Sequence, residues 1–368
     1  MDTRIIEQAR LLVDHSTKVK PKDMVLIRYN DNGLDLAKAV YVEAAKRGAN
    51  SFIMQVPTDA LRSFYDFMPE ENLTTVPANE LAAFLASDVI ISLRGEENLK
   101  AMSSIDKKKI AARANATEPI LTAYMKKRWV LTQVPSNAYA QEAGMSMREY
   151  EDFIYGAMLS DPKADEARLK TFEKLMDETS QVTIRSEDTD LTFSIKGRKA
   201  ISDLGEHNVP WSEVFTAPVE NSTEGHVSFD LPAIYAGSEA SDIRLEFSKG
   251  EVVDYKASKG EDLLKAMIET DDKTTRGSRK LGEFGIGTNY GITKFTRNML
   301  FDEKMAGTIH LALGRSYPDC RGANYSALHW DILKTMTNGE ILFDNKVAMS
   351  GGKLVIPPEE RQGGHGEV

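Results

Sequence analysis

The chain has 368 residues, 41% of them hydrophobic and 28% charged, which is the composition of a soluble globular protein large enough for two domains. Its net charge of −10 argues against nucleic acid or an anionic membrane surface as the main partner. One cysteine, Cys320, excludes an intrachain disulfide and a cysteine-rich zinc site, and no apolar stretch is long enough to span a bilayer.

The first part of the chain alternates helix and strand patterns. Residues 1–14 predict an amphipathic helix and not a signal peptide, because acidic residues interrupt the apolar positions. A helix over Leu34–Lys46, with Leu36, Val40, Val42 and Ala44 to Ala45 on its buried side, ends at Arg47-Gly48. Strands are expected on both sides of it and further along, at Asp23–Arg28, Ser51–Val56, Ser87–Leu93 and Trp129–Gln133.

A strand, a helix and a second strand in succession form a βαβ unit, so the sheet is expected to be parallel. The loops after these strands contain neither G-x-G-x-x-G nor a Gly-Lys-Ser/Thr phosphate loop. The sequence therefore predicts an α/β, Rossmann-like N-terminal domain without support for a nucleotide site.

The pattern changes near residue 180, where we place the domain boundary. Ser146 to Met176 is charge-rich and predicts a helical connector, and a β-hairpin is expected from Val182 onward. Short strands punctuated by glycine follow, with one helix over Glu261 to Asp271. We therefore expect domains over 1–180 and 181–368, the second a β-rich, mixed α+β catalytic domain, and a disordered tail from Arg361.

Metal-binding residue types occur inside apolar runs of the second half. Gly307 to Gly314 reads G-T-I-H-L-A-L-G, a buried strand in which Thr308, His310 and Ala312 share one face. In Ala327 to Leu333, A-L-H-W-D-I-L, a strand would direct His329 and Asp331 to one face and Trp330 to the other.

Glu283, which opens a glycine-rich segment, is the fourth candidate. A divalent metal ion suits such a mixture of imidazole and carboxylate in apolar surroundings. The alternative is a hydrogen-bonded core histidine in each strand. Cys320 is either a packing residue or a nucleophile, and a lone cysteine is usually the former.

Several ordered motifs resemble one known family over nearly the whole chain. They read N-V-P-W-S-E-V-F-T-A-P, L-G-E-F-G-I-G-T-N, D-E-K-M-A-G-T-I-H-L-A-L-G-R-S-Y-P and S-A-L-H-W-D, with A-Q-E-A-G-M-S-M-R-E-Y-E-D-F upstream. Together they are similar to the thermophilic metalloaminopeptidases, also called the aminopeptidase S and aminopeptidase T family.

The resemblance implies a two-domain enzyme that binds a pair of divalent ions, either zinc, cobalt or manganese. Carried over position by position, the implied metal ligands are Glu213, Glu283, Glu303, His310, His329 and Asp331. Tyr317 matches a tyrosine beside the metals, and the interval between His310 and His329 is shorter than in some members. His207 and His226 fall outside the motifs and are expected at the surface or behind the ligands.

The chain has no H-E-x-x-H, so it is not a helix-based zincin. The resemblance implies instead a two-metal hydrolysis of short peptides with a free N-terminus. Glu283 or Glu213 would shuttle the proton, and Tyr317 would donate a hydrogen bond to the oxyanion. The resemblance also implies a homodimer with an enclosed active site, and a cytoplasmic location is expected. The alternatives are a metal-dependent amidohydrolase acting on a non-peptide amide and a non-catalytic binding protein of the same fold.

Overall fold

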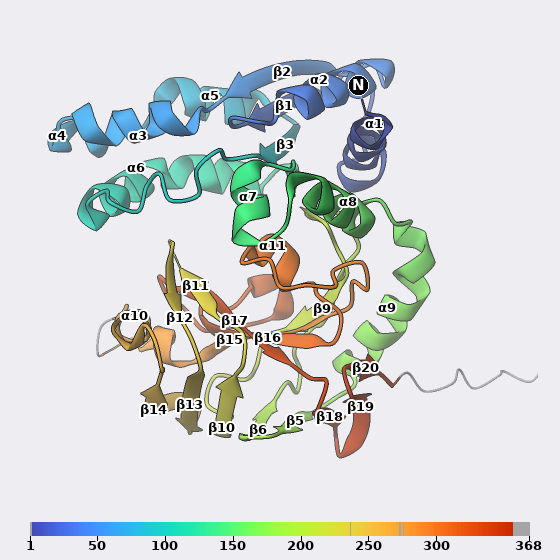
Figure 1. Cartoon of the computed structure of the whole chain (residues 1–368), viewed down its shortest axis with the longest axis vertical. Coiled ribbons are helices and arrows are strands. Elements are labelled where there is room, and N and C mark those ends of the chain that lie inside the picture. Colours follow the sequence, from blue (N-terminus) through green and yellow to red (C-terminus); the bar gives the residue numbers. More distant parts are fainter. Residues whose placement is uncertain (1, 236, 272–273, 275, 356–368) are drawn as a thin grey trace, which may run out of the picture.

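A parallel sheet covered by helices and a pair of antiparallel sheets form the two halves of the molecule (Figure 1). The structure is a computed structural model that describes residues 2–235, 237–271, 274 and 276–355. The tail from Arg361, predicted to be disordered, lies outside the described residues. Within the described part, no helix combines the length and apolar character needed to cross a bilayer.

The N-terminal half is built on five parallel strands in the order β2-β1-β3-β4-β8. The strands are β1 (Met24–Tyr29), β2 (Asn50–Gln55), β3 (Val89–Arg94), β4 (Arg128–Gln133) and β8 (Asn208–Val209). The four strands expected in this half are therefore confirmed within two residues at each end, and so is the parallel sheet.

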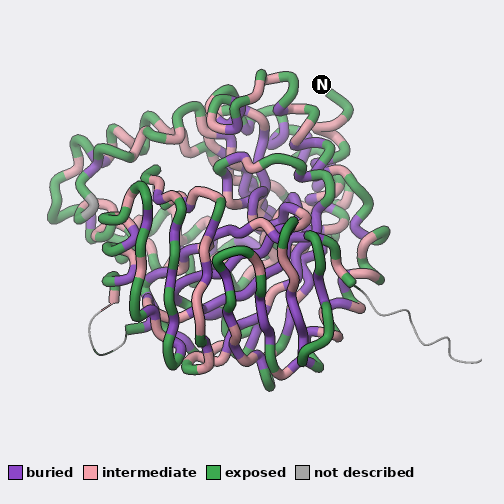
Figure 2. The backbone as a smooth tube through the Cα atoms, turned by 60° about the horizontal axis from the view of Figure 1, so that its bottom comes forward, coloured by how far each residue is buried: buried purple, intermediate pink, exposed green. Residues whose placement is uncertain are grey.

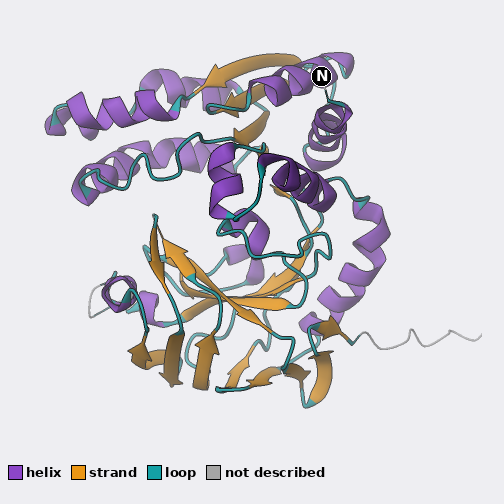
Figure 3. Ribbon diagram, viewed as in Figure 1, coloured by secondary structure: helices purple, strands orange, loops and turns teal. Residues whose placement is uncertain are grey.

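Helices lie on both faces of this sheet (Figure 3). Val25 and Ile27 of β1 pack in the core with α1, α2 and α8, whereas Leu26 packs in the core with α5 and α6. Both faces are apolar because helices cover both, as is usual for parallel sheets. The helices of this half are α1 (Thr3–Arg10), a π-helical turn (Leu11–Ser16), α2 (Leu34–Lys46), α3 (Thr58–Phe67), α4 (Glu70–Leu73), α5 (Ala78–Ala86), α6 (Lys107–Met125) and α7 (Asn137–Glu142).

The connector predicted as one helical run consists of two helices, α8 (Met147–Met158) and α9 (Pro162–Asp177). Proline lacks a backbone N–H, so Pro162 occupies the first turn of α9, where no N–H is needed. The Asp161 side chain caps α9 by accepting a hydrogen bond from the Lys163 N–H. The chain turns here and crosses to the second half.

The C-terminal half packs an eight-stranded antiparallel sheet against a five-stranded one. The first has the order β14-β13-β10-β6-β5-β18-β19-β20 and the second the order β17-β16-β15-β9-β7. Phe193 and Phe284, one from each sheet, meet edge to face with ring centroids 5.2 Å apart. Figure 2 shows buried residues gathered inside this half and exposed ones at its hairpin ends.

The elements of this half are β5 (Gln181–Ser186), β6 (Thr189–Ser194), β7 (Ile201–Asp203), β9 (Glu213–Thr216), β10 (Glu224–Phe229), β11 (Ala233–Tyr235), β12 (Ser238–Ala240), β13 (Ile243–Ser248), β14 (Glu251–Lys256), α10 (Glu261–Ile268), β15 (Leu281–Gly287), α11 (Met299–Asp302), β16 (Thr308–Gly314), β17 (His329–Thr335), β18 (Glu340–Phe343), β19 (Lys346–Ser350) and β20 (Lys353–Leu354). Short 3₁₀ turns lie at Gly277–Arg279 and Pro318–Cys320. The predicted hairpin is β5–β6, and the predicted helix is α10, which ends three residues early.

Several residues from beyond residue 180 pack in the N-terminal half. β8 lies beyond residue 180 but pairs with β4, and Trp211, which follows it, is fully buried in the N-terminal core. Leu300 and Phe301 pack in the same core. The boundary near residue 180 stays a prediction. Because β9 begins at Glu213, only three residues separate it from the parallel sheet.

Candidate metal centre

One face of the five-stranded sheet gathers five of the predicted metal ligands. Glu283 lies opposite Ala312, and Ala312 lies opposite Asp331. Directly opposed residues of antiparallel strands project to the same face, so these three form one row. His329 lies two residues from Asp331 on β17, and Trp330 between them is buried in the core on the other face.

Glycine makes room for His310 on this face. Gly285 lies opposite His310, and a Cβ atom built on Gly285 would be only 1.9 Å from the imidazole Nε2. The imidazole therefore extends over Gly285 toward β9. There Gly287 lies opposite Glu213, which brings the Glu213 carboxylate to the same space.

The first group of predicted ligands is Glu213, Glu283 and His310, all at most 5% exposed. His310 Nε2 is 3.2 Å from Glu283 Oε1 and 3.5 Å from Glu213 Oε2. The three can present one ligand atom each within 4.8 Å of one another, which is the spacing that a shared cation requires. We call this group the first triad.

The second triad is Glu283, His329 and Asp331. His329 Nε2 is 3.3 Å from Glu283 Oε2 and 3.6 Å from Asp331 Oδ2. His329 Nδ1 donates to the Arg315 carbonyl at 2.8 Å, which leaves Nε2 as the nitrogen that faces the acids. Glu283 belongs to both triads and directs one oxygen to each histidine.

The charges of the cluster favour cations. Burial alone would lower the pKa of His310, but its hydrogen bond with Glu283 and the charge of Glu213 raise the pKa to about 9. The neighbouring Asp331 and Glu283 raise the pKa of His329 to about 10, again against desolvation. Burial raises the pKa of Glu213, whereas for Glu283 the two histidines overcome burial and lower the pKa. In the absence of metal, protons on the histidines balance the carboxylates.

The donor set fits divalent metal ions. Glu213 Oε2, His310 Nδ1 and Asp331 Oδ1 are buried without a hydrogen-bond partner, which normally costs free energy. Cations in the triads would give the two carboxylate oxygens the partners that they lack. Imidazole nitrogen mixed with carboxylate oxygen suits zinc, cobalt or manganese.

Sequence reasoning missed Lys304, which is fully buried beside the cluster. Its ammonium nitrogen is 3.2 Å from Glu213 Oε1 and also forms an ion pair with Glu303. Asp203, opposite Glu213 on β7, was missed too, and its charge acts on the same lysine. Lys304 belongs to the charged sequence D-E-K, which usually forms a solvated turn, so its burial had no local signal.

Glu303, also a predicted ligand, belongs to neither triad. Its carboxylate contacts the Lys304 ammonium, and that ammonium contacts Glu213 in turn. A role for Glu303 in binding metal stays a prediction.

Tyr317 lies at the open side of the second triad, where the residue is 42% exposed. Its ring centroid is 5.1 Å from that of His329 and 5.9 Å from that of Phe215. Desolvation together with the charges of Glu283 and Asp331 raises the pKa of Tyr317, so its hydroxyl keeps its proton.

The remaining candidates lie elsewhere. His207 stacks on Trp129 at the surface, and His226 lies on β10 in the eight-stranded sheet. Cys320 is buried, and burial raises the pKa of its thiol, so it is not a thiolate near neutral pH. Two cavities, of about 700 and 290 Å³, are also outside the cluster, because no predicted ligand lines either one.

Comparisons with a family profile and with individual proteins point to the same family. The family profile described as thermophilic metalloprotease (M29) matches residues 1–342. Aminopeptidase AmpS of Bacillus subtilis is 26% identical over 350 residues, covering 84% of this chain and 83% of that protein. Aminopeptidase T of Thermus thermophilus is 24% identical over 351 residues, covering 81% of this chain and 84% of that protein.

Two solved structures share the fold. Wild-type AmpT from Thermus thermophilus has a TM-score of 0.86 at 21% identity, over 96% of this chain and 99% of that one. The 2,5-dihydroxypyridine dioxygenase from Pseudomonas putida KT2440 has a TM-score of 0.60 at 17% identity, over 97% of both chains. At these identities the likeness establishes the fold alone.

Proposed function

The chain belongs to the thermophilic metalloprotease (M29) family and is a metallopeptidase, and we propose that it is an aminopeptidase that releases N-terminal amino acids from short peptides by two-metal hydrolysis. The observation that carries the two-metal part is the pair of triads that share Glu283. Bound there, two divalent ions would supply hydroxide near neutral pH, polarise the scissile carbonyl and anchor the free α-amine of the substrate.

Glu283 and Glu213 have different roles in this proposal. Both oxygens of Glu283 face a histidine and its pKa is low, so it holds the two imidazoles in place and is a poor proton acceptor. Glu213 Oε2, which has no hydrogen bond, would hold an ion of the first triad, whereas Oε1 lies 3.2 Å from the Lys304 ammonium. Because burial raises the pKa of this carboxyl group, we assign to Glu213, through Oε1, the transfer of the proton from the attacking water to the leaving amine.

Tyr317 would donate its hydroxyl hydrogen to the oxyanion that forms at the scissile carbonyl. Its raised pKa keeps that hydrogen available, and its exposed edge beside His329 faces incoming substrate.

Lys304 bears on the order in which ions bind. Its ammonium already neutralises part of the charge of Glu213, so an ion entering the first triad competes with it. The second triad has no lysine contact among the described residues. We propose that the second triad fills first, and that substituting Lys304→Met strengthens binding of the other ion.

Metal counting tests this order. Protein prepared without chelator is titrated with zinc, cobalt or manganese, and bound metal per chain is measured by mass spectrometry after desalting. Two steps of unequal affinity, with the weaker one strengthened in Lys304→Met, are expected. A single ion in both proteins would overturn the two-metal proposal, and two equal steps in the unsubstituted protein would overturn the order.

The activity itself is tested with aminoacyl anilides, beginning with the leucyl anilide, and with the same compounds blocked at the amine. Release from the free-amine compounds alone, abolished by EDTA and restored by metal, is the expected result. Hydrolysis of both would indicate a broader amidohydrolase. If the protein binds metal but hydrolyses neither form of the anilides, it would catalyse a different reaction. The fold permits this, because a dioxygenase shares it.

A homodimer with an enclosed active site and a cytoplasmic location complete the proposal. Light scattering coupled to gel filtration would measure the mass, for which two chains of 40.9 kDa are expected.

A further inference from the structure

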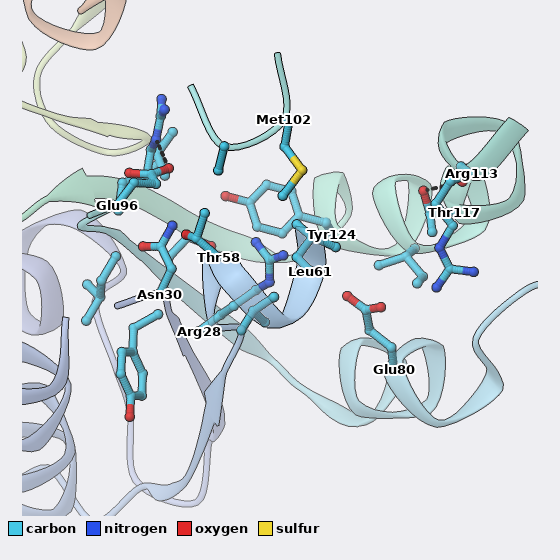
Figure 4. Close-up of a pocket in the computed structure, with 18 of the residues that line it drawn as sticks. Arg28, Asn30, Thr58, Leu61, Glu80, Glu96, Met102, Arg113, Thr117 and Tyr124 are labelled. Carbon is cyan, nitrogen blue, oxygen red and sulfur yellow. Dashed lines mark hydrogen bonds and ion pairs between the residues drawn. The ribbon is translucent and has the colours of Figure 1, made fainter. Parts of the chain in front are cut away.

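A cavity of about 700 Å³ lies in the N-terminal half, remote in the fold from the metal centre. It opens at the carboxyl ends of β1, β3 and β4, between the helices α3, α5 and α6 (Figure 4). Its volume is in the range of small-molecule sites. Neither its lining residues nor the elements that carry them include a predicted metal ligand.

The topology places this cavity where α/β proteins bind ligands. In the order β2-β1-β3-β4, the chain runs from β1 to β2 on one side and then crosses to β3 on the other. β1 and β3 are therefore neighbours from which the connections leave in opposite directions. The crevice outside the carboxyl ends of such a strand pair is the usual binding position in open α/β sheets.

Arg28, at the end of β1, lines this cavity with neither an ion pair nor a side-chain hydrogen bond among the described residues. Its Nε atom is buried without a hydrogen-bond partner, and it forms no ion pair with any carboxylate in the described part of the chain. The other two lining arginines are occupied: Arg94 pairs with Glu96 at 3.3 Å, and Arg113 donates to the Thr75 carbonyl and lies over the Phe64 ring. A guanidinium in this state favours an incoming anion.

The anion is better matched by a carboxylate than by a phosphate. Two backbone N–H groups at the strand ends, those of Thr58 and Glu97, already donate to Asp31, at 2.8 and 3.0 Å. The side-chain oxygen of Asn30 likewise accepts a hydrogen bond from the Gly95 N–H. These three N–H groups are therefore not free to bind a phosphate, and Asp31 and Glu96 add negative charge.

The rest of the lining suits an apolar molecule with an amine. Leu61, Phe84, Ile120 and Tyr124 form apolar and aromatic walls. Figure 4 shows Glu80 projecting from α5 into the same space as Arg28, but the two are not paired. One uncompensated cation, one carboxylate and apolar walls match a zwitterion that carries a hydrophobic side chain.

We propose that this cavity is a second binding site, separate from the metal centre, for an apolar amino acid or a dipeptide of such residues. The ligand carboxylate binds Arg28, its ammonium binds Glu80, and its side chain packs on Tyr124 and Phe84.

Isothermal titration calorimetry of the full chain tests the site, with L-phenylalanine as the probe. N-acetyl-L-phenylalanine, which keeps the carboxylate, and L-phenylalaninamide, which keeps the amine, separate the two contacts; the amide is measured in EDTA-treated protein, because the proposed metal-loaded aminopeptidase would hydrolyse it. L-Phenylalanine is expected to bind with equal affinity before and after EDTA and in His329→Ala. Binding lost with the metal would place the ligand at the metal centre and overturn the proposal, whereas the proposed peptidase function would stand.

Variants assign the contacts. Arg28→Met should weaken L-phenylalanine about tenfold or more, and Arg28→Lys, which keeps the charge, should weaken it less. Glu80→Gln, on the half-buried face of α5, should weaken L-phenylalanine but not its N-acetyl form. Arg148→Met, an exposed arginine of α8 outside the cavity, is the matched control and should change nothing.

Thermal melting of each variant shows whether it is folded. If Arg28→Met does not fold, Arg28→Lys and Glu80→Gln still decide the matter. Unchanged affinity in both, amide binding as tight as that of the free amino acid, or no binding of L-phenylalanine at all would each overturn the proposal.

Discussion

The metal centre and the N-terminal cavity carry unbalanced charges of opposite sign. The centre concentrates three buried or nearly buried carboxylates and two imidazoles at contacts of 3.2–3.6 Å, and the balancing charge must come from cations. The cavity leaves Arg28 unpaired beside open volume, and there the balancing charge must be an anion. The difference shows that a buried charge without its partner indicates the sign of the missing ligand.

The two regions also differ in how they are supported. The predicted ligands of the centre project from adjacent strands, and the register of β9, β15, β16 and β17 sets their spacing. The cavity is lined by strand ends and by helices that flank them. Changes in one should therefore leave the other intact, since distant sites without shared partners behave additively.

The largest effect is expected from Glu283→Gln, because it alters both triads at once. Glutamine keeps the shape but removes the charge that faces His310 and His329. Bound metal should fall in both triads and hydrolysis to background, because without metal the pKa of water returns from about 7 to about 15.7. Metal analysis and an anilide assay measure this, and L-phenylalanine binding should persist. Loss of both functions would break the separation of the two regions.

Gly285→Ala should have the next largest effect. The new Cβ would lie 1.9 Å from His310 Nε2, so the imidazole must leave its place in the first triad. We expect loss of one bound ion and most activity from a folded protein. Gly156→Ala is the control, since a Cβ there meets nothing within 4 Å and alanine favours the helix α8. Full metal content in Gly285→Ala would show that His310 is not a ligand.

Tyr317→Phe should lower kcat without removing metal. Loss of one oxyanion donor costs about 10²–10³-fold in other enzymes, and the partial exposure of Tyr317 argues for the lower end. The phenyl ring keeps the packing with Phe215 and His329, so stability should not change. A fall in bound metal, or an effect confined to KM, would exclude the proposed role.

The fold was largely readable because its signals are local. Leu34–Lys46 was predicted with both ends correct, since the C-terminal Arg47-Gly48 marks the stop. The same helix shows the limit, because Val42 was placed on its buried side and is 51% exposed. Val42 follows Val40 by two residues, and that step crosses to the opposite side of a helix.

The site was less readable, because its geometry depends on strand pairing. The period of two correctly places His329 and Asp331 on one face of β17, opposite Trp330. Nothing local reveals that Glu213, more than a hundred residues earlier in the chain than His329, reaches the same face through β9. Lys304 was missed for the same reason, since its acidic partner Glu213 is distant in sequence.

The smallest expected effect is a dependence of the melting temperature on pH. It should arise in the metal centre, which lacks cations, and not in the cavity, which lacks an anion. In metal-free protein the pKa of His310 is raised from 6.5 to about 9 and that of His329 to about 10. A raised histidine pKa stabilises the fold fully below about pH 6.5, and this stabilisation is lost as pH rises through the folded-state value. The melting temperature of EDTA-treated protein should therefore fall between pH 6.5 and 10.

Metal should reverse this trend, because its ligands must be unprotonated and protons compete with it less at high pH. The rise in melting temperature on adding zinc should thus grow from pH 6.5 to pH 9. In His329→Gln the slope of the metal-free protein should be shallower, since one of the two shifted groups is gone. L-Phenylalanine should not follow the zinc trend, because Arg28 stays charged throughout while the ligand ammonium that binds Glu80 loses its proton toward the upper end of this range, so its stabilisation should weaken there. A zinc effect independent of pH would show that the histidines are not protonated in the metal-free centre, and that the carboxylates alone bear its charge.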